Sequence, residues 1–444
     1  MVLQRYGEAA ETFDRILSLN PNLVDIWMQK GTALDKLAKK QDALAAYTKV
    51  LEINPENPEA WIKKGVILAD LGKIGDAVTA FNKALDINPA LGDIWMRKGD
   101  ALNTLGRSEE AAHAYAQSLK LNPEQEHGWI KEGRTLYDLG KYEDAIEAFD
   151  NAITINQRST EAFLYKGFAL EKLSRIDEAI QVFEVLLEID TNNSEGHFHM
   201  GLALANSGRQ KEALASFEAA LRIRENFAPA WYNKGKMLLD LGKYQDALAA
   251  FDKALELEPA YTEVFYYKGF ALQKIGRYQE AVEAFERNLE KDMSNSPGYY
   301  FKGIALSKLG RYKDALEAFD RALVYDPENA LVYYQKGRAF DGLGRHQEAV
   351  AAFEKTLSLK PKYSEARMRK GISLYELGRY AEAITDFERT ITENPHNFHA
   401  WYQKGRALFD MGHCDEAVEA YDHAPARRDG RRRAGVRLVR SLCL

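Results

Sequence analysis

Residues 58–91 read PEAWIKKGVILADLGKIGDAVTAFNKALDINPAL, and variants of this 34-residue unit recur along the chain. The glycine of this unit, Gly65, is one of twelve that follow one another at steps of 34 residues, from Gly31 to Gly405, without an insertion. Glycine inside a helix costs about 1 kcal/mol relative to alanine, so we expect each of these glycines to mark a place where two backbones nearly touch. A period in the range of roughly 20–50 residues predicts a linear array of stacked units rather than one compact core.

Other positions keep a fixed distance from this repeat glycine. The residue four positions earlier is aromatic in ten units, leucine follows three positions after in eleven, alanine follows at twelve, and an aromatic follows at sixteen. The apolar residues of each half-unit fall at helical spacing, as Trp61 and Leu68 do, and then Ala77 and Phe81. Gly72, between them, fits the left-handed residue that ends a helix. Each unit is therefore predicted to contain two helices.

This pattern of aromatic, glycine, leucine, alanine, aromatic and closing proline resembles the tetratricopeptide repeat. The resemblance implies an all-α solenoid in which paired antiparallel helices stack into a right-handed superhelix. The Trp-x-x-Lys-Gly wording of Trp61 to Gly65 is similar to long prokaryotic arrays, especially archaeal ones. We expect a partial repeat with only its second helix at residues 1–23, twelve tandem repeats at 24–424, and an arginine-rich irregular tail at 425–444.

Composition narrows the class of protein. The 444 residues carry a formal net charge of −6, and because the tail is basic, the repeats are more acidic than this total. An acidic array argues against nucleic-acid binding, which needs a basic surface. The sequence has no apolar run of about 18 residues, no signal-peptide pattern at its start and only two cysteines. We therefore expect a cytoplasmic protein without a membrane span.

The sequence lacks the motifs of catalytic and metal sites, including His-Glu-x-x-His and Cys-x-x-Cys. His197 and His199 are two residues apart, so on a helix they point to different faces, unlike the i, i+4 pair of a metal site. His197 also takes the place of the usual tryptophan, which favours a packing role. We expect no enzymatic activity, no cofactor and no metal.

The resemblance implies that the first helix of each repeat lines a concave groove. Positions are counted below from the repeat glycine, and in this family positions −3 and +1 point into the groove. We interpret them, with cations at position −2 for charge pairing, as a peptide-binding groove; the alternative is that the rings only pack on the adjacent repeat. The candidates at position −3 are Met28, Ile62, Met96, Ile130, Phe198, Tyr232, Tyr266, Tyr300 and Tyr334; those at +1 are Lys236 and Phe270; those at −2 are Lys63, Arg97 and Lys131.

Two known binding modes of the family are not expected. Members that clamp a carboxyl-terminal carboxylate carry a basic residue at position −3 and asparagine at +1, and none of the twelve repeats has either. An asparagine ladder at position −2 is also missing, since only Asn233 stands there.

The function predicted from these observations is a scaffold or adaptor that binds a protein or peptide segment in the groove. One alternative is a structural array that self-associates through its ends, and another is a regulatory fragment of a larger enzyme. The start resembles a second helix whose first helix is absent, and the repeat pattern breaks at Pro425, before an arginine run. A truncation or frame shift is the expected reason; the alternative is a basic tail for an anionic partner. Uncapped ends favour self-association.

Overall fold

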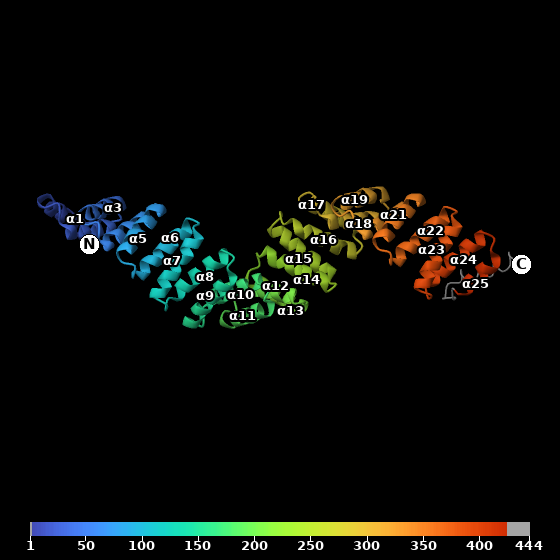
Figure 1. Cartoon of the computed structure of the whole chain (residues 1–444), viewed down its shortest axis with the longest axis horizontal. Helices are drawn as coiled ribbons and strands as arrows, with labels where there is room; N and C mark the ends of the chain where they lie inside the picture. The colour runs from blue at the N-terminus through green and yellow to red at the C-terminus, as the bar shows by residue number, and fades with distance from the viewer. Residues whose placement is uncertain (1, 424–444) are drawn as a thin grey trace. The chain divides into compact units, whose positions relative to one another are not determined.

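The computed structural model describes residues 2–423, so the predicted tail at 425–444 lies outside the described residues. Every regular element in the described part is an α-helix, which confirms the predicted fold class. The chain divides into two compact units, Met1–Glu225 and Asn226–Leu444, called here the N-terminal and the C-terminal unit (Figure 1). Each unit is a stack of helix pairs and is considered by itself.

The N-terminal unit contains α1 (Val2–Leu19), α2 (Val24–Lys36), α3 (Lys40–Ile53), α4 (Pro58–Asp70), α5 (Ile74–Ile87), α6 (Gly92–Thr104), α7 (Ser108–Leu121), α8 (Glu126–Asp138), α9 (Tyr142–Ile155), α10 (Thr160–Lys172), α11 (Ile176–Ile189), α12 (Ser194–Asn206) and α13 (Gln210–Ile223). The C-terminal unit contains α14 (Ala228–Asp240), α15 (Tyr244–Leu257), α16 (Thr262–Lys274), α17 (Tyr278–Leu289), α18 (Ser296–Lys308), α19 (Tyr312–Tyr325), α20 (Ala330–Gly342), α21 (His346–Leu359), α22 (Ser364–Glu376), α23 (Tyr380–Glu393), α24 (Phe398–Asp410) and α25 (Cys414–Asp422).

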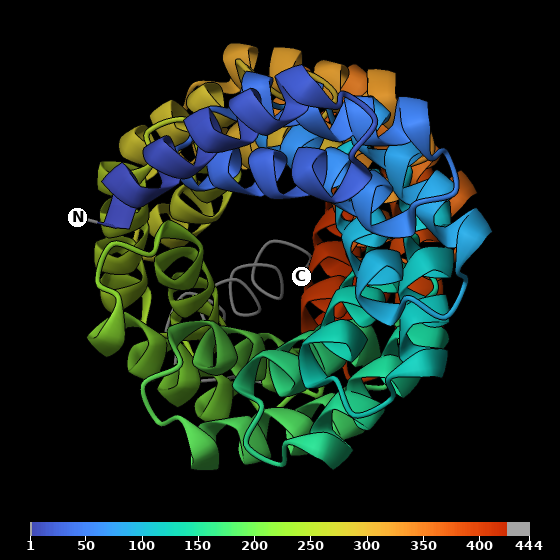
Figure 2. The same ribbon diagram turned by 90° about the vertical axis from the view of Figure 1, so that its left-hand side faces the viewer.

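Each repeat is a helix pair joined by a tight turn. The turn residue has a positive φ, as at Gly72 (73°) and Gly106 (72°), which is the left-handed conformation predicted for the glycine that ends the first helix. Ala38 and Ser174 hold the same turn at φ 58° without being glycine. The two helices of a pair lie side by side both in Figure 1 and in the view turned by 90° (Figure 2).

The repeat glycines make room for an aromatic ring rather than for a second backbone. A methyl group on Gly65 would lie 2.5 Å from Cε1 of Phe81, and one on Gly99 would lie 2.5 Å from Cε1 of Tyr115. The same contact recurs in all twelve repeats, from Gly31 to Gly405. The expectation of close backbones is therefore corrected. The partner is the ring sixteen residues later, which fills the space between the two helices of the pair.

The aromatic at position −4 fixes the loop that enters the first helix. The indole Nε1 of Trp61 donates a hydrogen bond to the carbonyl oxygen of Pro55 at 2.8 Å, and Trp95 bonds Pro89 in the same way at 2.9 Å. His197 replaces this tryptophan, and its Nε2 lies 3.1 Å from the carbonyl oxygen of Thr191, also six residues earlier. The histidine is thus a packing residue that keeps a polar contact of the missing indole.

Successive pairs stack through both of their helices. First helices also approach the first helices of neighbouring pairs, as α8 does with α10 and α16 with α18. Second helices approach one another less closely. Within each unit, the surface formed by the first helices is therefore the concave side, and the candidate groove residues lie on these helices.

Candidate functional site

The predicted groove residues at position −3 are less exposed than a free groove surface would require. Ile130 (4% exposed), Phe198 (9%) and Tyr232 (6%) are buried. The other six are half-buried: Met28, Ile62, Met96, Tyr266, Tyr300 and Tyr334.

The tyrosines of this row pack against the second helix of their own pair. The ring centroid of Tyr334 lies 5.9 Å from that of Phe353, and Tyr266 lies 6.1 Å from Phe285. Burial raises the pKa of Tyr232 above its usual value. Position −3 is therefore part of the packing between helices, with only its edge open to the concave side.

Positions +1 and −2 meet on the concave side instead. Position +1 of one repeat and position −2 of the next are 31 residues apart, and they contact each other repeatedly. Lys131 Nζ donates to Asp100 Oδ1 at 2.6 Å, the centroids of Phe168 and His199 are 4.1 Å apart, and Arg134 lies 4.9 Å over the ring of Tyr165. We call each such contact a step of the first-helix surface.

In the N-terminal unit, two cations of this surface, Lys131 and Arg134, have carboxylate partners. Lys131 is bonded to Asp100, which also accepts a hydrogen bond from the Tyr115 hydroxyl at 2.9 Å. Arg134 Nη1 pairs with Glu161 at 2.9 Å. Arg97, which is exposed, lines a cavity of about 180 Å³ together with Asp100 and Asp70, and Lys63 is half-buried. His199 Nδ1 lies 2.8 Å from Glu171.

In the C-terminal unit, cations of this surface lie over aromatic rings. Lys236 Nζ is 5.4 Å from the ring centroid of Tyr232 and 5.1 Å from that of Tyr267. Lys274 lies 5.0 Å over Phe270, whose ring contacts Phe301 edge-on at 5.2 Å. Attraction between a cation and the face of a ring holds these side chains without neutralising their charge. Among residues 226–423, neither lysine forms an ion pair with a carboxylate.

A cavity of about 490 Å³ opens on the same surface between α18, α20 and α22. Three of its lining residues are exposed cations: Lys308 at position +5, Arg338 at +1 and Arg369 at −2. Asp341 also lines it, with Oδ1 accepting hydrogen bonds from Ser373 Oγ at 2.7 Å and from His346 Nδ1 at 3.1 Å. The remaining lining residues are Ile304, Ser307, Tyr312, Gln335, Ala339 and Gly342.

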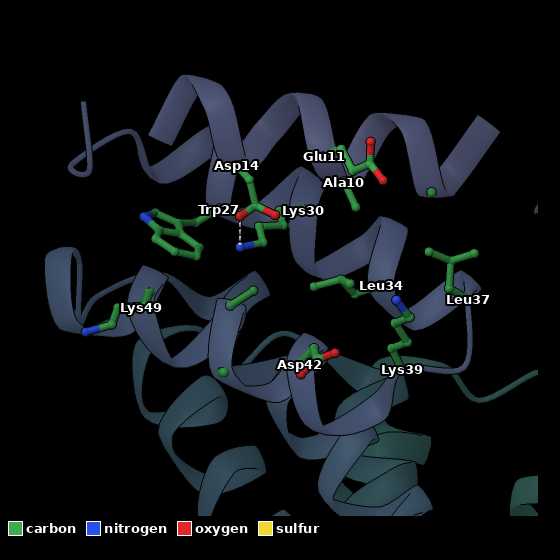
Figure 3. Close-up of a pocket in the computed structure, with 13 residues that line it drawn as sticks. Ala10, Glu11, Asp14, Trp27, Lys30, Leu34, Leu37, Lys39, Asp42 and Lys49 are labelled. Carbon is green, nitrogen blue, oxygen red and sulfur yellow. Dashed lines mark hydrogen bonds and ion pairs between the residues drawn. The ribbon is translucent and has the colours of Figure 1, made fainter. Parts of the chain in front are cut away.

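Lysine stands at position −1 in most repeats, and its side chain reaches the preceding helix pair. Lys30 lies over Trp27 and forms an ion pair with Asp14 of α1, in a cavity of about 460 Å³ (Figure 3). Lys268 pairs with Asp252 at 2.6 Å in the same way, reaching the second helix of the preceding pair. These lysines therefore join successive pairs and are taken up by packing.

No group of three or more histidine, cysteine, aspartate or glutamate side chains in residues 2–423 is arranged to hold a metal ion. Over the same residues, none of the helices has the length and apolar character needed to cross a membrane.

The contact between position +1 of one repeat and position −2 of the next was not among the predictions. The signal for it was present, since Asp100 and Lys131 are complementary at an offset of 31 residues. Tyr165, Tyr267 and Phe301, all at position −2, belong to this surface and were not among the predicted site residues.

A stack of helix pairs built on a 34-residue unit defines the class of helical repeat solenoids. Within this class, the tetratricopeptide-repeat family model matches residues 28–91, 63–126, 130–194 and 300–367, and the chain belongs to that family. Related models with the same description match residues 194–227, 228–261 and 250–283. A model described as anaphase-promoting complex, cyclosome, subunit 3 matches residues 343–424.

Among curated proteins, none matches the chain by sequence. Solved structures similar to the chain include YrrB, described as a tetratricopeptide-repeat protein with an unusual peptide-binding site (25% identity over 43% of this chain and 97% of that one, TM-score 0.38). MamA from Desulfovibrio magneticus RS-1 is 26% identical over 38% of this chain and 96% of that one, with a TM-score of 0.37. The Naa15/Naa10 structure bound to HypK covers 95% of this chain and 74% of that one at 17% identity and a TM-score of 0.43. TM-scores this low assign no function.

Proposed function

We propose that this protein is a non-catalytic, cytoplasmic scaffold that binds an extended polypeptide segment along the concave first-helix surface. Membership of a family whose repeats typically mediate protein–protein interaction supports the class of function. The observation that carries the proposal is the strip of half-exposed rings and cations in the C-terminal unit, represented by Lys236, Tyr267, Phe270 and Phe301.

This strip suits a polypeptide ligand for two physical reasons. Partly exposed rings give large contact areas at a low entropic cost, and the cations above them remain able to bond a ligand carbonyl or carboxylate. A repeating step also offers equivalent contacts along an extended chain, so that many weak contacts add up.

The position −3 residues keep a secondary role in this proposal. Their open edges border the strip, but because Tyr232 and its equivalents pack on the second helices, replacing them would lower stability as well as binding. The test must therefore use residues at positions +1 and −2, where a ring can be removed with less loss of packing.

The experiment is selection of peptides from a random 12-residue library on the full chain, followed by titration of the selected peptides. Phe270→Ala is expected to weaken binding by about tenfold or more, in line with the concentration of interface energy in aromatic anchors. The matched control is Val66→Ala, at the same position +1 in the N-terminal unit. Equal binding by both variants, with unchanged helicity, would contradict the proposal, as would a library that yields no binder.

Self-association is the competing function, and the mass of the protein in solution distinguishes it. Light scattering over a hundredfold range of protein concentration should give one constant mass for a scaffold. A mass that keeps rising with concentration would favour the structural array.

A further inference from the structure

We propose that the cavity between α18, α20 and α22 is an anion site that takes an oxyanion carried by the bound polypeptide, either an aspartate or glutamate carboxylate or a phosphate ester. The inference rests on the proposed function, because it names the chemical class of ligand that the first-helix surface selects. Under this proposal, the C-terminal unit is the part of the array that discriminates ligands by their charge.

The charges at positions +1 and −2 set this step apart from the others. At all the remaining steps of the chain, positions +1 and −2 never hold two cations. They hold two opposite charges, one cation and one uncharged residue, or two uncharged residues. Only Arg338 and Arg369 place two cations at one step, and both line the cavity. Both side chains are exposed, so water weakens their mutual repulsion, and an anion between them would remove it.

The cations that line this cavity are not neutralised by carboxylates of residues 226–423. Within residues 226–423, Arg338, Arg369 and Lys308 form no ion pair with a carboxylate, and Arg338 Nη1 donates only to the amide oxygen of Gln335, at 3.1 Å. The one acid of the lining, Asp341, already accepts bonds from Ser373 and His346. Three cations therefore face the cavity against one engaged carboxylate.

Two further residues, Gly342 and Ser307, distinguish the wall of this cavity. Position +5 is Gly342 in this repeat and a residue with a side chain in the remaining eleven. A methyl group on Gly342 would lie 2.6 Å from the ring of Tyr312. The ring of Tyr312 therefore takes the place of that side chain at the wall of the cavity. The hydroxyl of Ser307, also on the lining, is buried and has no hydrogen-bond partner among the described residues.

The chemistry of these groups points to a planar or tetrahedral oxyanion. Guanidinium groups bond carboxylate and phosphate oxygens in a bidentate manner, which makes them selective for shape as well as charge. A volume of about 490 Å³ exceeds that of a carboxylate or phosphate group, so the ligand backbone can pass along the surface while one side chain enters.

The experiment has two readouts on the full chain. In the first, inorganic phosphate and glutarate are titrated while thermal unfolding is followed, with chloride at equal ionic strength as the reference. In the second, peptides from the library selection are acetylated and amidated at their ends, and one central residue is varied between glutamine, glutamate and phosphoserine. Blocked ends ensure that a terminal carboxylate is not the group that binds.

The variants are a double substitution, Arg338→Gln with Arg369→Gln, and a matched control, Arg97→Gln with Arg134→Gln, at the same positions −2 and +1 in the N-terminal unit. We expect glutamate or phosphoserine peptides to bind about tenfold more tightly than the glutamine peptide, and the double variant to lose this preference. We also expect phosphate to raise the unfolding temperature of the parent and of the control but not of the double variant. A larger gain for phosphoserine than for glutamate assigns the site to a phosphate ester.

The outcomes separate this inference from the proposed function. If peptides bind but show no preference for the acid, or if the control loses the preference as much as the double variant does, the anion site is refuted and the scaffold stands. If phosphate stabilises the parent but no peptide binds, the anion site stands as a small-anion site and the scaffold proposal fails.

Discussion

Positions +1 and −2 of the first-helix surface carry different combinations of charge in the two units. In the N-terminal unit, Asp100 and Lys131 form an ion pair at 2.6 Å, and the Tyr115 hydroxyl also bonds Asp100. In the C-terminal unit, Arg338 and Arg369 occupy the same two positions and line an open cavity. The first step satisfies its own charges, and the second holds two cations without a carboxylate partner among residues 226–423.

This difference shows how a repeat array can carry one specific site without changing its backbone. The glycine, ring and turn of each repeat fix the spacing, so that an exchange at position +1 can replace an internal ion pair by two cations at one step. The cost is a local excess of positive charge, which the scaffold tolerates because the side chains are exposed to water.

The largest expected effect comes from placing the position +1 residue of one unit into the other. Arg338→Asp copies Asp100 into the C-terminal unit and should pair with Arg369, which removes the anion response entirely. We expect the preference for an acidic peptide to fall about tenfold or more, while the free energy of unfolding changes by less than about 1 kcal/mol. Peptide titration and urea unfolding measure the two effects.

The reverse exchange, Asp100→Arg, breaks the pair with Lys131 and leaves the Tyr115 hydroxyl without its acceptor. We expect a loss of about 1–3 kcal/mol in the free energy of unfolding, recovered in part by phosphate. The control is Asp100→Asn, which keeps an acceptor for Tyr115 and should show no phosphate response. Equal phosphate responses in both variants would argue that the step does not determine anion binding.

A smaller difference between the units lies at position −1. In the C-terminal unit, Lys268 and Lys302 pair with Asp252 and Glu286 of the preceding helix pair. In the N-terminal unit this position is Glu132 in one repeat, and its Oε2 is buried without a hydrogen-bond partner among the described residues. The pKa of Glu132 is raised to about 7, mainly by burial and in addition by the nearby Glu147 and Asp144, while Lys120 lowers it.

Because the folded state holds this proton up to about pH 7 and the unfolded chain releases it near pH 4.5, the free energy of unfolding should fall as the pH rises between these values and stay low above them. We expect Glu132→Gln to be neutral at pH 4 and to stabilise by about 2 kcal/mol at pH 8. Urea unfolding at both values measures this, with exposed Glu109→Gln as the control. A gain of equal size at both pH values would contradict the assignment.

The repeat architecture could be predicted because every signal for it is local and appears twelve times. The family, the helix pairs and the turn at Gly72 follow from spacing within one unit. The reason for the repeat glycines was wrong because a glycine shows where a Cβ is excluded but not which group excludes it. That group, the ring of Phe81 or its equivalent, was already visible in the sequence sixteen residues later.

The candidate surface was less predictable because it depends on contacts between repeats. Depth at position −3 is decided by the neighbouring helices, so Tyr232 and Tyr334 differ in exposure although they share a position. The cavity beside Arg338 is lined by residues of three successive repeats, and no pattern within a single unit contains such a combination. Peptide binding by the predicted groove residues remains a prediction.

The smallest expected effect concerns the turns, which also differ between the units. Both turns without glycine, at Ala38 and Ser174, lie in the N-terminal unit, whereas the turns described in the C-terminal unit, such as Gly242 and Gly276, use glycine. A left-handed conformation costs a residue with a side chain about 1 kcal/mol. Glycine avoids this cost, but it loses more conformational entropy on folding, which offsets part of the gain.

We therefore expect Ser174→Gly to raise the free energy of unfolding of the N-terminal unit by about 0.5–1 kcal/mol. Hydrogen exchange resolved by repeat measures this locally, and the slowing should be greatest in α10 and α11, on either side of the turn. Gly140→Ala, at the equivalent turn of the preceding repeat, is the matched control and should lower stability by a similar amount. If Ser174→Gly instead speeds exchange in α10 and α11, the serine hydroxyl stabilises the turn by more than the left-handed backbone costs.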